Sequence, residues 1–114
     1  MELKTIKKLT GSWIEATGTV IRFENPDRLK IATLFQETYD LLDQYSKIEL
    51  VPKEISALLI EMNEFSWWVS NLEDTPTHSF YQEITTLVYA LNKFFLTRDY
   101  DVTTIENTIE NICN

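Results

Sequence analysis

Residues 31–45 read IATLFQETYDLLDQY, and most of their apolar side chains recur at steps of three and four. This stripe consists of Ile31, Leu34, Phe35, Thr38, Leu41, Leu42 and Tyr45. The acidic residues Glu37, Asp40 and Asp43 fall on a different face, as is typical of an amphipathic helix with one side in a core. Upstream, Asn25 can cap free amides and Pro26 suits the first helical position. We therefore predict a helix of about five turns from Pro26 to near Ile48.

The same pattern continues toward the C-terminus in three further segments. Pro52 opens the first, whose stripe runs through Ile55, Leu58, Leu59, Met62, Phe65, Val69 and Leu72. The second follows a break at residues 73–77, with Thr75 as cap and Pro76 in the first turn, and carries Phe80, Tyr81, Ile84, Leu87, Val88, Leu91, Phe94 and Phe95. The last is short, begins with the capping-box pair Thr103 and Glu106, and carries Ile105, Ile109 and Ile112. All three prolines thus stand at predicted helix starts.

The first 24 residues allow two interpretations. A seam of steps of three and four, made of Ile6, Leu9, Trp13, Ala16, Val20 and Phe23, indicates a helix. Many β-branched residues and two glycines instead suit a β-hairpin over residues 5–24 that turns at Thr17 and Gly18. We favour the helix because the seam covers nearly the whole segment. On it, Gly11 and Gly18 share a face, where they either admit a neighbouring helix or simply weaken this one.

The sequence therefore predicts an all-α protein: an antiparallel up-down four-helix bundle with a short C-terminal helix, in a single domain over residues 1–114. The alternative is an α+β fold with the N-terminal hairpin. A chain of 114 residues with 44% hydrophobic residues has enough apolar material for one core.

The sequence shows no pattern of residues that would carry catalysis. Cys113 is the one cysteine and His78 the one histidine, so a multi-cysteine zinc site is excluded. No Glu is followed three residues later by His, as a bundle-type dinuclear metal site would need. His78 is expected to be a surface or capping residue, and neither glycine belongs to a nucleotide-binding motif. We therefore expect no catalytic residue, no metal and no cofactor, and interpret the protein as non-enzymatic.

The net charge of −8 argues against direct nucleic-acid binding, which needs clustered Lys and Arg. The charge is uneven, because residues 1–30 carry +2 and residues 31–114 carry −10. Such a distribution favours a basic protein partner through electrostatic steering. No apolar run is long enough to span a membrane and no secretory signal is evident at the N-terminus, so a cytoplasmic location is expected.

Four residues are the candidate partner-binding residues: Trp67, Tyr39, Tyr89 and Glu64. Trp67 and Trp68 are adjacent and point about 100° apart on a helix, so both cannot lie in one narrow stripe. Trp68 is expected at the core edge. Trp67 either belongs to a patch for a partner or to an inner helix contacted on two sides. Two other roles stay open: a self-associating structural bundle, closed by Trp67 into a homodimer, and a small-molecule or metal binder with a pocket between helices.

Residues 9–21, LTGSWIEATGTVI, resemble a segment of small helical bacterial proteins of unknown function. In architecture alone, a short acidic and aromatic bundle resembles the bacteriocin immunity proteins, which are small antiparallel four-helix bundles. These resemblances imply no activity and carry over no functional residue. A sufficient core, the lack of a catalytic constellation, an acidic surface and surplus aromatic residues lead us instead to expect a small acidic protein that binds another protein, of the immunity, antitoxin or adaptor type.

Overall fold

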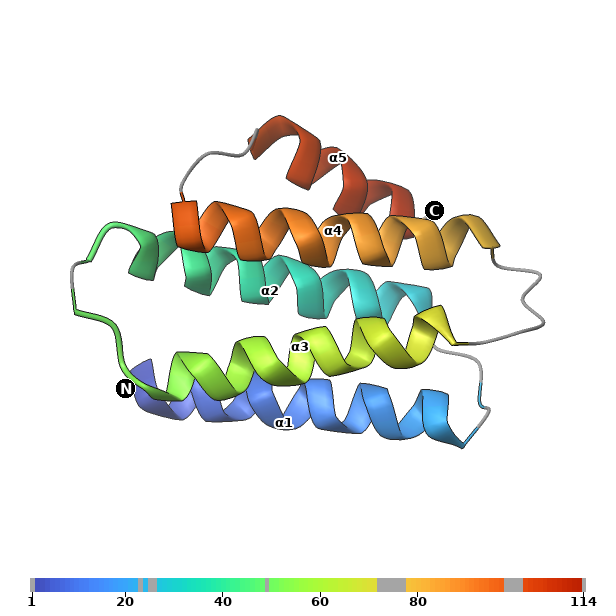
Figure 1. Cartoon of the computed structure of the whole chain (residues 1–114), viewed down its shortest axis with the longest axis horizontal. Coiled ribbons are helices and arrows are strands. Elements are labelled where there is room, and N and C mark those ends of the chain that lie inside the picture. The colour runs from blue at the N-terminus through green and yellow to red at the C-terminus, as the bar shows by residue number, and fades with distance from the viewer. Residues whose placement is uncertain are drawn as a thin grey trace.

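The chain forms five α-helices in a computed structural model that describes residues 2–22, 24, 27–48, 50–71, 78–97 and 102–113. The helices are α1 (Glu2–Ile21), α2 (Arg28–Ser46), α3 (Glu54–Ser70), α4 (His78–Thr97) and α5 (Val102–Cys113), shown in Figure 1. Within those residues there is no strand, which confirms the predicted all-α class. The alternative of an N-terminal β-hairpin is wrong, since residues 5–21 lie in α1.

Helix α1 forms despite its β-branched residues because its apolar seam is buried against the other helices. The hydroxyls of Thr10, Thr17 and Thr19 donate to the carbonyl oxygens four residues earlier, at 2.8, 3.0 and 3.1 Å. Such a bond satisfies the hydroxyl inside the helix, although it does not itself stabilise the helix. The 3-4 seam supplies the buried side, where Ile6 and Trp13 are fully buried.

The helix starts differ in detail from those that the prolines predict. Helix α2 begins at Arg28 with Asp27 as its N-cap, whose carboxylate accepts from the amides of Leu29 and Lys30 at 3.0 and 3.3 Å. The predicted cap Asn25 and Pro26 lie outside the described residues, as do Thr75 and Pro76. Helix α3 starts two residues after Pro52.

The predicted capping box at Thr103 is wrong as a helix start. Helix α5 begins one residue earlier, at Val102, so Thr103 already lies inside it. Boundaries of this kind vary by one or two residues between sequence patterns and structures.

The helices pack as a bundle in which successive helices run in opposite directions (Figure 1). Helix α1 packs most extensively against α3, its parallel neighbour, and the pairs α1–α2, α2–α4 and α4–α3 complete a ring. In the described part of the chain, no close backbone contact joins α2 to α3 or α1 to α4. The α1–α2 edge of the ring is therefore opposite the α3–α4 edge.

Helix α5 lies across α2 and α4 and is tied to α2 at its C-terminal end. The Arg28 guanidinium donates to the carbonyl oxygens of Ile112 and Asn111, with N···O distances of 2.9 and 3.4 Å. A cation is favourable there, because the last carbonyls of a helix carry partial negative charge. None of the helices in the described residues is both long and apolar enough to cross a membrane.

Trp13 stands at the centre of the core, where α1 meets α2 and α3. Its ring packs edge-on against Phe35 with centroids 4.8 Å apart, and tilted against Phe65 at 5.4 Å. Its indole N–H donates to the Thr38 hydroxyl at 3.0 Å, and that hydroxyl donates in turn to the Leu34 carbonyl at 2.8 Å. All polar atoms of this buried pair are thereby satisfied, as a low-dielectric core requires.

We expect Thr38→Val to lower the free energy of unfolding by about 1–3 kcal/mol, because it leaves the buried Trp13 indole N–H without an acceptor. Chemical denaturation followed by circular dichroism measures this loss. The matched control is Thr108→Val, which removes only a bond to the carbonyl of Thr104 in the same helix and should cost less. Equal losses for the two variants would contradict the role assigned to Thr38.

The two glycines of α1 were expected either to admit a neighbouring helix or to weaken α1, and the surroundings of Gly11 favour the second interpretation. A Cβ built on Gly11 meets no atom within 4 Å, whereas one on Gly18 lies 3.1 Å from Nη1 of Arg22. No neighbouring helix therefore needs Gly11.

We expect Gly11→Ala to raise the free energy of unfolding by about 0.5–1 kcal/mol, because alanine lowers the conformational entropy of the unfolded chain. Gly18→Ala should gain less, since it displaces a guanidinium paired with Glu24. A destabilising Gly11→Ala, measured in the same denaturation assay, would overturn this reasoning.

Candidate protein-binding surface

Two large apolar residues are exposed on the outer side of α3, and a polar residue lies between them, about one helical turn from each. Ile60, Asn63 and Trp67 follow each other at steps of three and four, and all three are exposed. Together with Leu59 and Glu64 they line a shallow depression. Trp67 has 56% of its surface exposed, which places it outside the core. Helix α3 has α1 and α4 packed against it, but Trp67 lies on the side that these neighbours leave open.

The exposed Trp67 ring is supported from behind by Trp68. The two indoles meet edge to face, with centroids 5.1 Å apart and planes at 88°. Trp68 is half-buried and packs against the core, as its sequence position predicts. Its indole N–H donates to the Glu64 carboxylate at 3.1 Å. Glu64 thus holds Trp68, and Trp68 in turn limits the orientations open to Trp67.

A pair of asparagines joins α3 to α4 beside this depression. The Asn63 amide donates to the Asn92 carbonyl oxygen at 3.2 Å, and the Asn92 amide returns the bond at 3.0 Å. Each amide also donates to a carbonyl four residues earlier in its own helix, at 2.7 and 2.8 Å. The pair sets the register of the two antiparallel helices.

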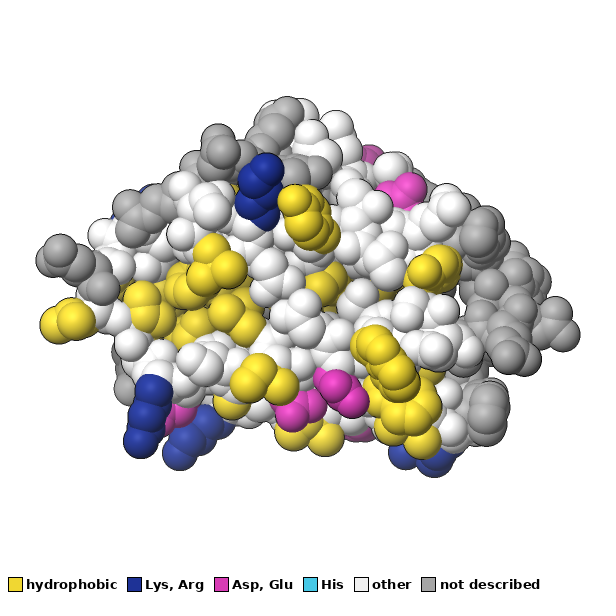
Figure 2. Space-filling view, viewed as in Figure 1, with side chains coloured by type: hydrophobic (Ala, Val, Ile, Leu, Met, Phe, Trp, Pro, Cys, Tyr) yellow, Lys and Arg dark blue, Asp and Glu magenta, His cyan; other side chains and the backbone are white. Residues whose placement is uncertain are grey.

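Helix α4 adds two exposed apolar residues next to the asparagine pair. Tyr89 and Leu96 lie about one turn either side of Asn92 and are exposed. Helical spacing turns both toward the same open side as Ile60 and Trp67. We call this surface the α3–α4 face: Ile60, Asn63, Glu64, Trp67, Tyr89, Asn92 and Leu96. Figure 2 shows hydrophobic side chains in separate groups over α3 and α4, with acidic side chains among them over α3.

Of the four candidate partner-binding residues, the structure brings three to this face. Trp67 and Glu64 come from α3 and Tyr89 from α4. The sequence reasoning missed Asn92 and Leu96, because the pairing of α3 with α4 is not visible in a single sequence. The signal available was Asn92 itself, a polar residue between Leu91 and Phe94 of the apolar stripe.

Tyr39 lies elsewhere, on α2, with only 7% of its surface exposed. Its ring packs against Phe94 of α4 with centroids 5.4 Å apart. Burial raises the pKa of the Tyr39 hydroxyl, and the carboxylates of Asp43, Glu106 and Asp40 raise it further. The phenol is therefore held neutral, and Tyr39 contributes to the core and not to the α3–α4 face.

The raised pKa of Tyr39 makes stability fall at alkaline pH. The unfolded chain releases this proton near pH 10, before the folded protein does. The contribution of Tyr39 to the free energy of unfolding is therefore fully present below about pH 10 and is lost as the pH rises past it. We expect Tyr39→Phe to make this decline shallower. Urea denaturation at several pH values between about 9 and 11 measures it. An unchanged slope in Tyr39→Phe would refute the assignment.

Metal-ligating side chains do not gather in the described residues. No group of three or more His, Cys, Asp or Glu there is placed to hold a metal ion. On α2, Glu37 and Asp40 are exposed, and Asp40 accepts from the Gln36 amide at 2.9 Å. Cys113 is exposed at the end of α5, and the His78 side chain lies outside the described residues.

Comparison with protein-family models, with curated proteins and with solved structures finds no match for this chain.

Proposed function

We propose that this protein acts by binding another protein, and that the α3–α4 face is the docking surface. The observation that carries the proposal is Trp67, exposed yet supported edge-on by Trp68. Tryptophan is enriched among the residues that dominate binding energies. A side chain already restricted in the free protein also loses less entropy when a partner covers it.

The charge of the protein favours a basic partner. Glu64 lies in the face itself, and the chain carries −8 overall, with −10 over residues 31–114. A positively charged partner would be steered toward such a body, while an apolar site on it receives Trp67. The same charge disfavours direct binding to nucleic acid.

In this proposal the protein is non-enzymatic and needs no metal or cofactor. The four long helices act as an antiparallel up-down bundle that holds the face rigid, with α5 as a brace. Within this proposal we expect an immunity, antitoxin or adaptor role in the cytoplasm.

Self-association through the same face is the second candidate, and the exposed Ile60 and Leu96 favour it. In a two-fold symmetric dimer, however, the face meets its own copy, so both Glu64 carboxylates are brought into the same interface. Like charges in an interface cost binding energy, so we favour a different protein as partner. Light scattering decides between them: a monomer at micromolar concentration removes self-association, and a dimer lost in Trp67→Ala establishes it.

We expect Trp67→Ala to keep the fold and weaken partner binding by about 2 kcal/mol, or about 30-fold in Kd. Affinity capture from the source organism, quantified by mass spectrometry, identifies proteins that wild type retains and Trp67→Ala loses. The Kd is then measured with the purified partner.

The control is Ile14→Ala, which shortens a residue on α1 with a comparable 53% exposure. This variant should retain the partner. If Trp67→Ala unfolds, Trp67 has a structural role; if it binds as wild type does, the α3–α4 face is not the docking surface.

A further inference from the structure

A second open surface lies between α1 and α2, on the edge of the ring opposite the α3–α4 face. Because α1 packs most extensively on α3, it leaves a groove between its C-terminal half and the N-terminal half of α2. The groove spans residues 12–19 of α1 and 29–37 of α2. We call it the α1–α2 groove.

The floor of the α1–α2 groove is apolar. It contains Ala16, Ile31 and Leu34, of which Ile31 and Leu34 are buried against the core. Leu29 extends this apolar surface at one end and is exposed. Ala16 is small, so the middle of the floor has room for a side chain from another molecule.

The rim of the groove is acidic. Four carboxylates line it, those of Glu15, Glu24, Asp27 and Glu37. The only basic side chain among the lining residues is Lys30. Two of the four carboxylates are occupied within the chain, since Glu24 pairs with Arg22 and Asp27 caps α2. Within the described residues, no hydrogen bond or ion pair engages the carboxylates of Glu15 and Glu37.

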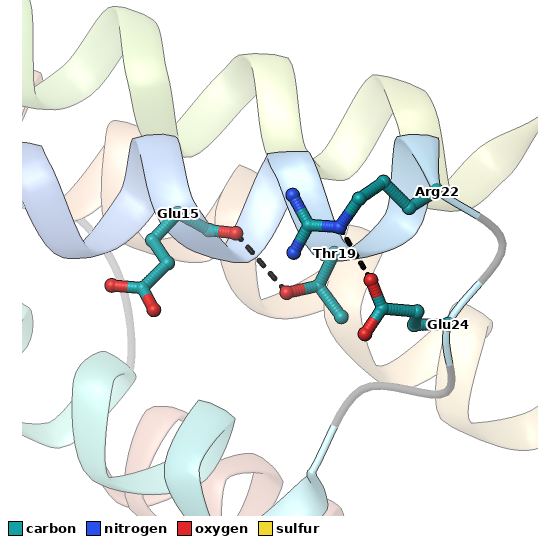
Figure 3. A network of polar contacts seen from close by, with 4 residues as sticks. All are labelled: Glu15, Thr19, Arg22 and Glu24. Carbon is teal, nitrogen blue, oxygen red and sulfur yellow. Dashed lines mark hydrogen bonds and ion pairs between the residues drawn. The ribbon is translucent and has the colours of Figure 1, made fainter.

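Glu15 and Glu37 stand on opposite walls of the groove. Figure 3 shows the Glu15 carboxylate extending from α1 on the side of α2, while its backbone carbonyl accepts from Thr19. Glu37 comes from α2, three residues after the buried Leu34. A helix laid in the groove would therefore pass between two carboxylates above an apolar floor.

We propose that the α1–α2 groove binds a basic amphipathic helix of a partner protein. The apolar face of that helix would cover Ala16 and Leu34, as helices dock in grooves through residues at steps of three and four. Its Lys or Arg side chains would reach Glu15 and Glu37. This inference does not depend on the α3–α4 face.

A synthetic peptide tests the proposal directly. The probe is a dye-labelled helix of leucine and lysine, about 18 residues long so that the helix is populated, with leucine on one face. Fluorescence anisotropy should give saturable binding that weakens as salt is added. A matched peptide with glutamate in place of lysine should not bind. Amide chemical-shift changes in the labelled protein should centre on residues 12–19 and 29–37.

Three variants locate the binding site. Glu15→Lys and Glu37→Lys should each weaken binding about fivefold at low salt. Ala16→Leu fills the floor without changing the charge and should also weaken it. The control is Glu83→Lys on α4, which changes the net charge equally but lies outside both surfaces, and it should bind as wild type does. Trp67→Ala should also bind the peptide normally, which separates this test from that of the proposed function.

Several outcomes would overturn the inference. They are the absence of saturable binding, shift changes centred on Ile60 and Trp67, and an Ala16→Leu variant that binds as tightly as wild type. A loss in Glu83→Lys as large as in Glu37→Lys would mean that the peptide responds to the net charge alone.

Discussion

Trp13 reaches into the bundle from α1, donates its indole N–H to Thr38 of α2 and packs its ring against Phe65 of α3. This one side chain joins three helices, and its hydrogen bond is satisfied only when α1 and α2 are in register. A helix displaced by one turn would bury an indole N–H without an acceptor. The packing of Trp13 therefore determines where α1 lies, and with it the surfaces that the bundle leaves open on either side.

Periodicity predicted the fold class because it depends on local spacing alone. The stripe from Ile31 to Tyr45 and the seam from Ile6 to Val20 each predict the buried side of a helix, and the structure buries those residues except Ala16, which is partly buried. Helix starts were less well predicted. Proline shows that a helix is near, but the capping carboxylate of α2 came from Asp27, and α5 began before its capping box. Such ends depend on hydrogen bonds at single residues.

The candidate surface was predictable only in part, because it depends on which helices pack side by side. Helical geometry alone separates Trp67 from Trp68. It does not show that α4 lies beside α3, and so it could not unite Asn63 with Asn92 or bring Leu96 to the face. Tyr39 was expected among the partner-binding residues, and its burial depends on the proximity of Phe94 of α4, which the sequence does not show.

The ring order of the helices has a consequence for how the chain reaches this structure. Its most extensive helix pair, α1 with α3, joins segments such as Trp13 and Phe65 that are 52 positions apart in the sequence. The whole of α2 must be looped out before that pair can form. Closing this loop costs chain entropy before the stabilising contacts between α1 and α3 form. Folding rates fall as the contacts of a structure become less local in sequence. The bundle should therefore fold more slowly than one of equal size whose tightest pairs are chain neighbours.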